Sequence, residues 1–118
     1  MSTSDAPAPA GAYSQGRRIG PFLQVSGQLG LGEGAVTVSQ QTELALRHVT
    51  AILDAGGATW ADVLTVRAFI ADDDLFDEFD ATYAAVVPQP YPARVTVAVG
   101  LAPGALVEID ALAVLDRF

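Results

Sequence analysis

SQQTELALRHVTAILDAGG, residues 39–57, followed by ATWADVLTVRAFI, residues 58–70, carries the strongest secondary-structure signals of this sequence. Its first part has apolar side chains at steps of three and four, the period of one helix face: Ala45, Leu46, Val49, Ile52 and Leu53. Ser39 can cap the start of such a helix, and Gly56-Gly57 can end it because glycine adopts a left-handed C-cap without strain. We therefore predict an amphipathic helix between these two signals.

The second part of that stretch indicates a buried strand. Val63–Ile70 is rich in β-branched and aromatic residues, and both of its alternating faces are largely apolar, so we expect both sides to be covered. A second helix follows, because Asp72-Asp73-Asp74 supplies carboxylates where a helix N-terminus favours them and Pro88 ends an apolar stripe. That stripe consists of Leu75, Phe76, Phe79, Tyr83, Val86 and Val87.

Further strands are predicted on both sides of this helix–strand–helix unit. Gly20-Pro21 separates two short runs, 17–19 and 22–26, and is a turn signal between the strands of a hairpin. Ala93–Val99 and Leu106–Leu115 are the last two strands, which we expect to pair as a second hairpin through the turn-rich segment between them. The order ββαβαββ predicts an α+β fold, a mixed sheet with both helices packed on one face.

The chain ends and the second sheet face lead to two further expectations. Residues 1–10 contain Ser, Ala, Pro and Asp without an apolar period, so we expect a disordered leader before a single domain, 11–118. Two helices cannot cover both faces of the sheet. We therefore expect the remaining apolar face to pack against copies of the same chain in an oligomer.

Composition narrows the class of function. The 118 residues suffice for one domain, and no apolar run approaches the length of a membrane span or forms a signal peptide, which favours a cytoplasmic protein. There is no cysteine, so a thiol nucleophile, a disulfide or a cysteine zinc site is excluded. Six basic against fourteen acidic residues give a net charge of −8, which repels a phosphate backbone and makes nucleic acid an unlikely partner.

The candidate chemistry lies on the last two strands. Arg94 interrupts an otherwise apolar strand, and Glu108 and Asp110 share one face of the next. In the expected hairpin, a register that places Arg94 across from Glu108 or Asp110 keeps charges with charges. Two interpretations stay open: a buried ion pair with no further role, or a site in which Arg94 holds a substrate carboxylate and Glu108 orients a water. Tyr13 and Ser26 add hydroxyl groups.

Four motifs in order resemble the reactive intermediate deaminase (RidA/YjgF) family: Gly11-Ala12-Tyr13-Ser14-Gln15, Val25-Ser26-Gly27-Gln28, Pro92-Ala93-Arg94 and Val107-Glu108-Ile109-Asp110-Ala111. The resemblance implies a chorismate-mutase-like α+β fold and a homotrimer with a site at each subunit interface. It also implies hydrolysis of reactive 2-imino or 2-enamino acids, such as 2-aminoacrylate or 2-iminopropanoate, to 2-keto acids and ammonia, without a cofactor or metal.

The resemblance also implies roles for individual residues. Arg94 matches the arginine that binds the substrate carboxylate, and Glu108 matches the glutamate that positions the hydrolytic water. Tyr13, Ser26 and Gly27 match residues that line the substrate site.

Three positions depart from the family pattern. Thr96, which we place with the substrate-binding residues, stands where some members carry cysteine. Ala12 replaces the usual proline before the tyrosine. Asp80 stands where many members have asparagine, and its charge would repel a carboxylate if it lay close.

Other functions, and purely structural roles for some residues, remain possible alternatives to a deaminase. A non-catalytic regulatory protein that binds small carboxylates would keep Arg94 and could dispense with Glu108. A stress-protective, chaperone-like protein would need neither residue, and a ribonuclease would need a basic surface. On the predicted helix His48 lies beside the apolar stripe, which favours a solvated residue without a catalytic role. Trp60 is expected to pack at the corner between the first helix and the strand after it.

Overall fold

In the computed structural model, which describes residues 1–116, the first helix is α1 (Val38–Ala55) and Thr37 caps it. The Thr37 hydroxyl accepts from the Gln40 backbone N–H at 3.1 Å, and the Gln40 side-chain oxygen accepts from the Thr37 N–H at 3.1 Å. The prediction of Ser39 as the cap is therefore wrong by two residues, since the Ser39 hydroxyl hydrogen-bonds Thr82 instead. The predicted end is confirmed, with Gly57 in the left-handed region at φ +80°.

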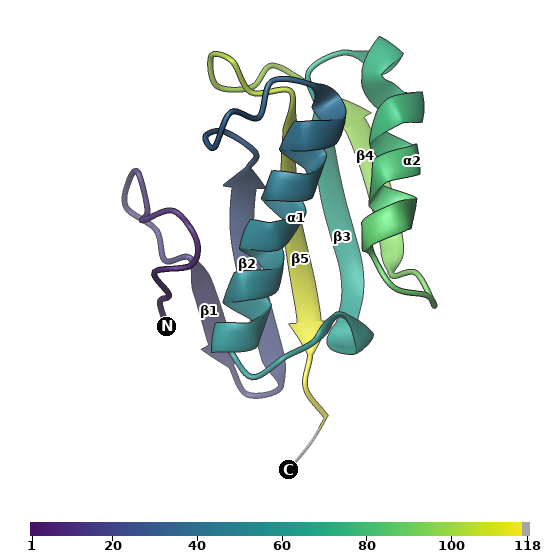
Figure 1. The fold of residues 1–118 in the computed structure, drawn as a ribbon. Helices are drawn as coiled ribbons and strands as arrows, with labels where there is room; N and C mark the ends of the chain where they lie inside the picture. Colours follow the sequence, from purple (N-terminus) through teal and green to yellow (C-terminus); the bar gives the residue numbers. More distant parts are fainter. Residues whose placement is uncertain (117–118) are drawn as a thin grey trace.

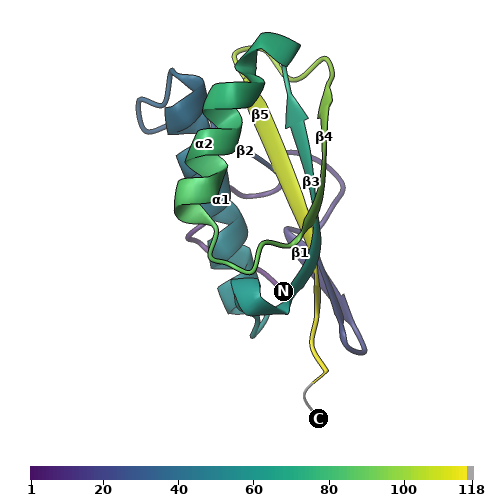
Figure 2. The ribbon, with the colours of Figure 1, turned by 90° about the vertical axis from the view of Figure 1, so that its right-hand side faces the viewer.

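Five strands and a second helix complete the fold, and both helices cover the same face of one mixed sheet (Figures 1 and 2). The strand order across the sheet is β1-β2-β5-β3-β4. The elements are β1 (Gly16–Ile19), β2 (Phe22–Leu29), β3 (Val63–Ile70), α2 (Phe76–Val86), β4 (Ala93–Ala98) and β5 (Val107–Val114). The predicted order ββαβαββ and the α+β class are confirmed, and β1 and β2 form the predicted antiparallel hairpin. Within residues 1–116, neither helix combines the length and apolar character needed to cross a membrane.

The predicted hairpin of the last two strands is wrong. β5 lies between β2 and β3 and is antiparallel to both, whereas β4 is the outermost strand and pairs in parallel with β3. The reason is that α2 makes a crossover connection that returns the chain parallel to β3. Arg94 therefore pairs with Val66, and Asp110 pairs with Arg67, so the register that places Arg94 opposite Glu108 or Asp110 is wrong as well.

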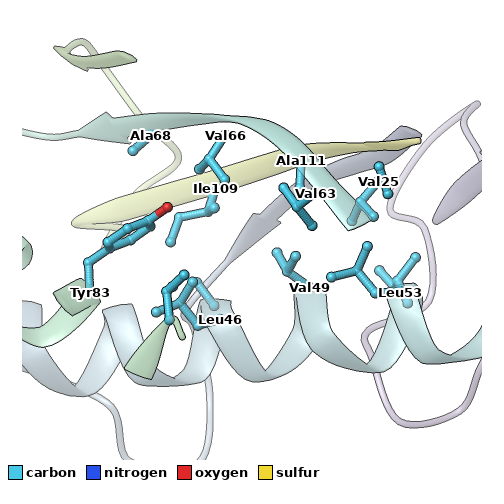
Figure 3. Packing of buried hydrophobic residues seen from close by; sticks show 14 of the residues in the cluster. Val25, Leu46, Val49, Leu53, Val63, Val66, Ala68, Tyr83, Ile109 and Ala111 are labelled. Carbon is cyan, nitrogen blue, oxygen red and sulfur yellow. The ribbon is translucent and has the colours of Figure 1, made fainter. Parts of the chain in front are cut away.

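The core lies between the helices and the sheet. Figure 3 shows side chains of α1 meeting those of β2, β3 and β5, and these are among the most deeply buried in the protein. The labelled residues of this layer include Val25, Leu46, Val49, Leu53, Val66, Ile109 and Ala111, which are at most 1% exposed. Every second residue of β5, from Val107 to Ala113, is fully buried against the helices, and this explains the central place of β5 in the sheet.

The sheet face away from the helices carries apolar side chains that no element of the described chain covers. Val95 and Val97 of β4 are 51% and 42% exposed, and Phe22 of β2 is 51% exposed. The expectation that this face packs against further copies of the chain stays a prediction.

Residues 1–10 have a defined course beside the β1–β2 hairpin. The Gln15 side-chain amide donates to the backbone oxygens of Thr3, Ala6 and Pro7 at 3.1, 3.2 and 2.7 Å. Its side-chain oxygen accepts from the Thr3 N–H at 2.8 Å. These contacts do not support the expectation that residues 1–10 are disordered. The last two residues of the expected domain 11–118 lie outside the described residues.

Candidate functional site

Arg94 and Glu108 point to opposite faces of the sheet. Arg94 is the register partner of Val66, which is fully buried beneath the helices, so the guanidinium lies on the helix side. Glu108 lies between Val107 and Ile109, which both point into the helix-side core, so its carboxylate lies on the other side. One chain therefore does not bring these two side chains into a common cavity.

A cavity of about 510 Å³ on the outer face of the sheet contains Glu108. Eight residues line it, four of them predicted site residues: Tyr13, Gln24, Val25, Ser26, Gly27, Arg67, Glu108 and Asp110. The sequence-predicted residues Tyr13, Ser26, Gly27 and Glu108 thus lie together, although they come from three separate segments of the chain.

A break in the ladder of β2 shapes this cavity. The register of β2 against β5 shifts between Val25 and Gln28, so Ser26 and Gly27 form an irregular segment beside β5. A Cβ atom on Gly27 would lie 2.6 Å from the Glu108 Oε2, far inside contact distance. The carboxylate of Glu108 therefore rests directly on the Gly27 backbone, and only glycine leaves it that position.

Two residues with hydroxyl groups, Tyr13 and Ser26, line the same cavity as Glu108. The Ser26 hydroxyl donates to the Ser14 backbone oxygen, and the Ser26 N–H donates to the Gln15 oxygen at 2.9 Å, so Ser26 offers its lone pairs to the cavity. Tyr13 is half exposed, and its phenolic oxygen accepts from the Ala10 N–H at 3.1 Å. Its O–H therefore stays available as a donor.

Sequence reasoning missed the only cation of this cavity's lining, Arg67. The Arg67 guanidinium donates to both carboxylate oxygens of Asp110. Nε lies 3.2 Å from Oδ1 and 2.9 Å from Oδ2, and Nη2 also donates to Oδ2. These hydrogen bonds and the charge of Asp110 raise the pKa of Arg67 above its ordinary value, so the guanidinium stays fully charged. The alternation of β3 places Arg67 on the outer face of the sheet with Thr65 and Phe69. Its pairing with Asp110 could be predicted only if β5 was known to lie beside β3.

Arg94 lies in a second cavity, of about 360 Å³, between α2 and β4. The guanidinium Nη2 donates to Asp80 Oδ1 at 2.7 Å, and its carbon is 4.6 Å from the Tyr83 ring centroid. The Phe79 and Phe76 centroids lie at 5.3 and 5.9 Å, so three aromatic rings surround the cation. The sequence-predicted register places Arg94 near Glu108 or Asp110. That expectation is wrong within one chain, because Arg94 faces α2 and pairs with Asp80.

Thr96 and Tyr83 carry buried hydroxyl groups behind Arg94. Neither Tyr83 Oη nor Thr96 Oγ1 has a hydrogen-bond partner among residues 1–116, and Thr96 lines neither of the two cavities. Figure 3 shows the Tyr83 hydroxyl directed toward the sheet. Burial raises the pKa of Tyr83, so the phenol is neutral at physiological pH.

The remaining side chains that sequence analysis weighed are structural. His48 is 7% exposed with Nδ1 3.0 Å from the Leu29 oxygen, so the prediction of a solvated histidine is wrong. The Trp60 indole donates to the Thr50 hydroxyl at 2.9 Å and packs against the core between α1 and β3, as predicted. Over residues 1–116, the histidine and acidic side chains form no group of three that could hold a metal ion.

The structure is thus a small α+β domain with a cavity that contains a carboxylate on the sheet face away from the helices. The family model described as endoribonuclease L-PSP matches residues 3–115. This chain therefore belongs to the RidA/YjgF family, as its four motifs indicated.

Individual relatives match over nearly their whole length. A RutC family protein of Pyrococcus horikoshii is 35% identical over 94% of this chain and 93% of its own. A 2-iminobutanoate/2-iminopropanoate deaminase of Dermatophagoides farinae is 33% identical over 98% and 95%. The crystal structure of E. coli TdcF with bound serine superposes with a TM-score of 0.90 at 32% identity, covering 97% of this chain and 96% of that one.

Proposed function

We propose that this protein is a deaminase that hydrolyses reactive 2-imino and 2-enamino acids to 2-keto acids and ammonia. The observation that carries the proposal is the Glu108 carboxylate held over Gly27 in a cavity with two hydroxyl side chains, in a chain of this family. The relative from Dermatophagoides farinae that is named as an imine deaminase supports the same activity.

The reaction needs one water and no redox partner. A 2-enamino acid first tautomerises to the 2-imino acid, whose carbon is electrophilic. Glu108 accepts a proton from the water as its oxygen attacks that carbon, and the proton then moves to the nitrogen. As the adduct collapses, its hydroxyl proton moves to the nitrogen, the carbonyl forms, the C–N bond breaks and ammonia leaves. Arg94 holds the substrate carboxylate, so the protein contributes mainly position, which alone is worth about 7–11 kcal/mol in favourable cases.

Arg94 and Glu108 point to opposite faces of the sheet, so the proposal requires two copies of the chain. A site that contains both residues must take Arg94 from one copy and Glu108 from another. β4 is an edge strand with exposed Val95 and Val97, and these side chains give a neighbouring copy an apolar surface to cover. We therefore propose a homotrimer with its sites between subunits.

The first test generates imines in solution from several amino acids with an amino-acid oxidase and follows the release of keto acid. We expect the protein to accelerate hydrolysis, and Glu108→Gln to slow turnover by about 100-fold or more, because the water loses its base. Glu43→Gln removes an exposed carboxylate of α1 and serves as the matched control, which should behave like the unchanged protein. No acceleration with any imine would overturn the proposal.

A binding protein for small carboxylates is the second candidate, since E. coli TdcF holds serine in its crystal structure. Under that function the protein binds ligands and accelerates no imine hydrolysis. The ribonuclease of the family model's description is not supported, because a net charge of −8 opposes RNA binding.

A further inference from the structure

The ion pair between Arg94 and Asp80 leaves both partners partly free. One nitrogen, Nη2, meets one oxygen, Oδ1, at 2.7 Å, and this is the single hydrogen bond of either side chain within residues 1–116. The other N–H groups of Arg94 and the second oxygen of Asp80 remain available to a ligand. The Arg94 side chain is 19% exposed and that of Asp80 is 46% exposed, so solvent reaches both.

The surroundings of the pair fix it in place. The rings of Phe76, Phe79 and Tyr83 lie within 5.9 Å of the guanidinium carbon and favour the position of Arg94 beside Asp80. Across the cavity, the Tyr91 hydroxyl donates to the Ala84 oxygen at 3.2 Å and ties the segment before β4 to α2. A ligand of Arg94 must therefore bind where the Asp80 charge is already present.

This arrangement distinguishes ligands by charge. A simple carboxylate at Arg94 gains the attraction of the guanidinium but also meets the nearby Asp80 carboxylate, and the two opposing interactions largely cancel. A ligand that also carries a cationic nitrogen next to its carboxylate satisfies both groups. Its carboxylate accepts from Arg94, and its N–H donates to the free oxygen of Asp80.

We propose that Asp80 is a specificity-determining residue, which makes the Arg94 site select zwitterionic 2-imino acids, protonated on nitrogen, over plain carboxylate anions. The inference rests on the proposed function, since it names the charge state of that substrate. It also implies that the 2-keto acid product binds more weakly than the substrate, because hydrolysis replaces the cationic nitrogen with a neutral oxygen while Asp80 keeps its charge.

The test compares two unreactive ligands that share one carbon skeleton, L-alanine as the zwitterion and pyruvate as the anion. Titration calorimetry gives a Kd for each with the unchanged protein, with Asp80→Asn and with Asp77→Asn. Asparagine keeps one oxygen acceptor for Arg94 at nearly the same size. It removes the negative charge and replaces the second oxygen, the one proposed to accept from the ligand, with an NH2 group. Asp77 is exposed on the same helix and controls for the change in net charge.

We expect the unchanged protein to bind L-alanine more tightly than pyruvate. Asp80→Asn should shift the ratio of the two Kd values by at least about tenfold toward pyruvate, and Asp77→Asn should leave the ratio unchanged. An unaltered ratio in Asp80→Asn, an equal tightening of both ligands, or no binding of either ligand to any of the proteins overturns the proposal. Imine turnover is measured separately, so a failure of the deaminase assay and a failure of this selectivity are distinguishable.

Discussion

At the scale of single residues, the decisive contact is that between Gly27 and Glu108. The Glu108 side chain occupies the space in which any other residue at position 27 would place its Cβ atom. The sequence motifs named both residues, but their contact depends on the irregularity of β2 opposite β5, which no motif encodes. Gly27 is therefore a positioning residue for the carboxylate in the proposed mechanism.

We predict that Gly27→Ala slows imine hydrolysis by roughly 100-fold, because a displacement of about 1 Å at a reacting group has an effect of that size. Gly100→Ala is the matched control, since a Cβ atom there has no neighbour within 4 Å. Steady-state turnover of both variants checks the prediction. Equal rates for the two alanine variants would show that the position of Glu108 over Gly27 has no part in catalysis.

Among the charged residues, Glu108 lies in a cavity with the other predicted site residues, and its proposed role stays a prediction. The surroundings expected for Arg94 were wrong. Alternation along a strand predicted a buried Arg94 in need of a partner; the structure has it only partly buried and supplies Asp80. That partner is on α2, fourteen positions earlier in the chain. A pairing between a strand and the helix above it could not be predicted before the strand order was known.

At the scale of elements, the sequence predicted the helices and strands far better than their neighbours in the sheet. The connection from Val99 to Leu106 can join adjacent strands, about 5 Å apart, or pass over one strand, about 10 Å away. Its glycine and proline residues are compatible with both connections. What places β5 in the centre is the full burial of its helix-side residues, which a central strand requires and an edge strand does not.

Helix α1 offers a test of how local signals fix an element. We predict that Thr37→Ala lowers the free energy of unfolding by about 1 kcal/mol, because it removes the hydroxyl that accepts from Gln40 in the capping box. Glu43→Ala, on the exposed side of the same helix, should change stability little. Chemical denaturation with both variants provides the measurement. A Thr37→Ala variant as stable as the unchanged protein would mean that packing alone sets the start of α1.

At the scale of the whole molecule, the two faces of the sheet have different tasks in our account. The helix face holds the core and the Arg94 cavity, and the bare face holds the Glu108 cavity and exposed apolar side chains. The fold class and the order of elements were predictable from the two amphipathic helices and the apolar strands, whereas the strand order in the sheet was not. The separation of Arg94 from Glu108 was not predictable either, and it turns the expected oligomer from a matter of covering apolar surface into a requirement of the proposed chemistry.

Subunit complementation tests this central claim most directly. Arg94→Ala and Glu108→Gln chains, each expected to be inactive alone, are unfolded, mixed in equal amounts and refolded together. Imine hydrolysis by the mixture is then compared with that of the unchanged protein treated in the same way. If each site takes Arg94 from one copy and Glu108 from another, random assembly restores intact sites and about one quarter of the unchanged activity. A mixture that stays as inactive as either variant would contradict the account.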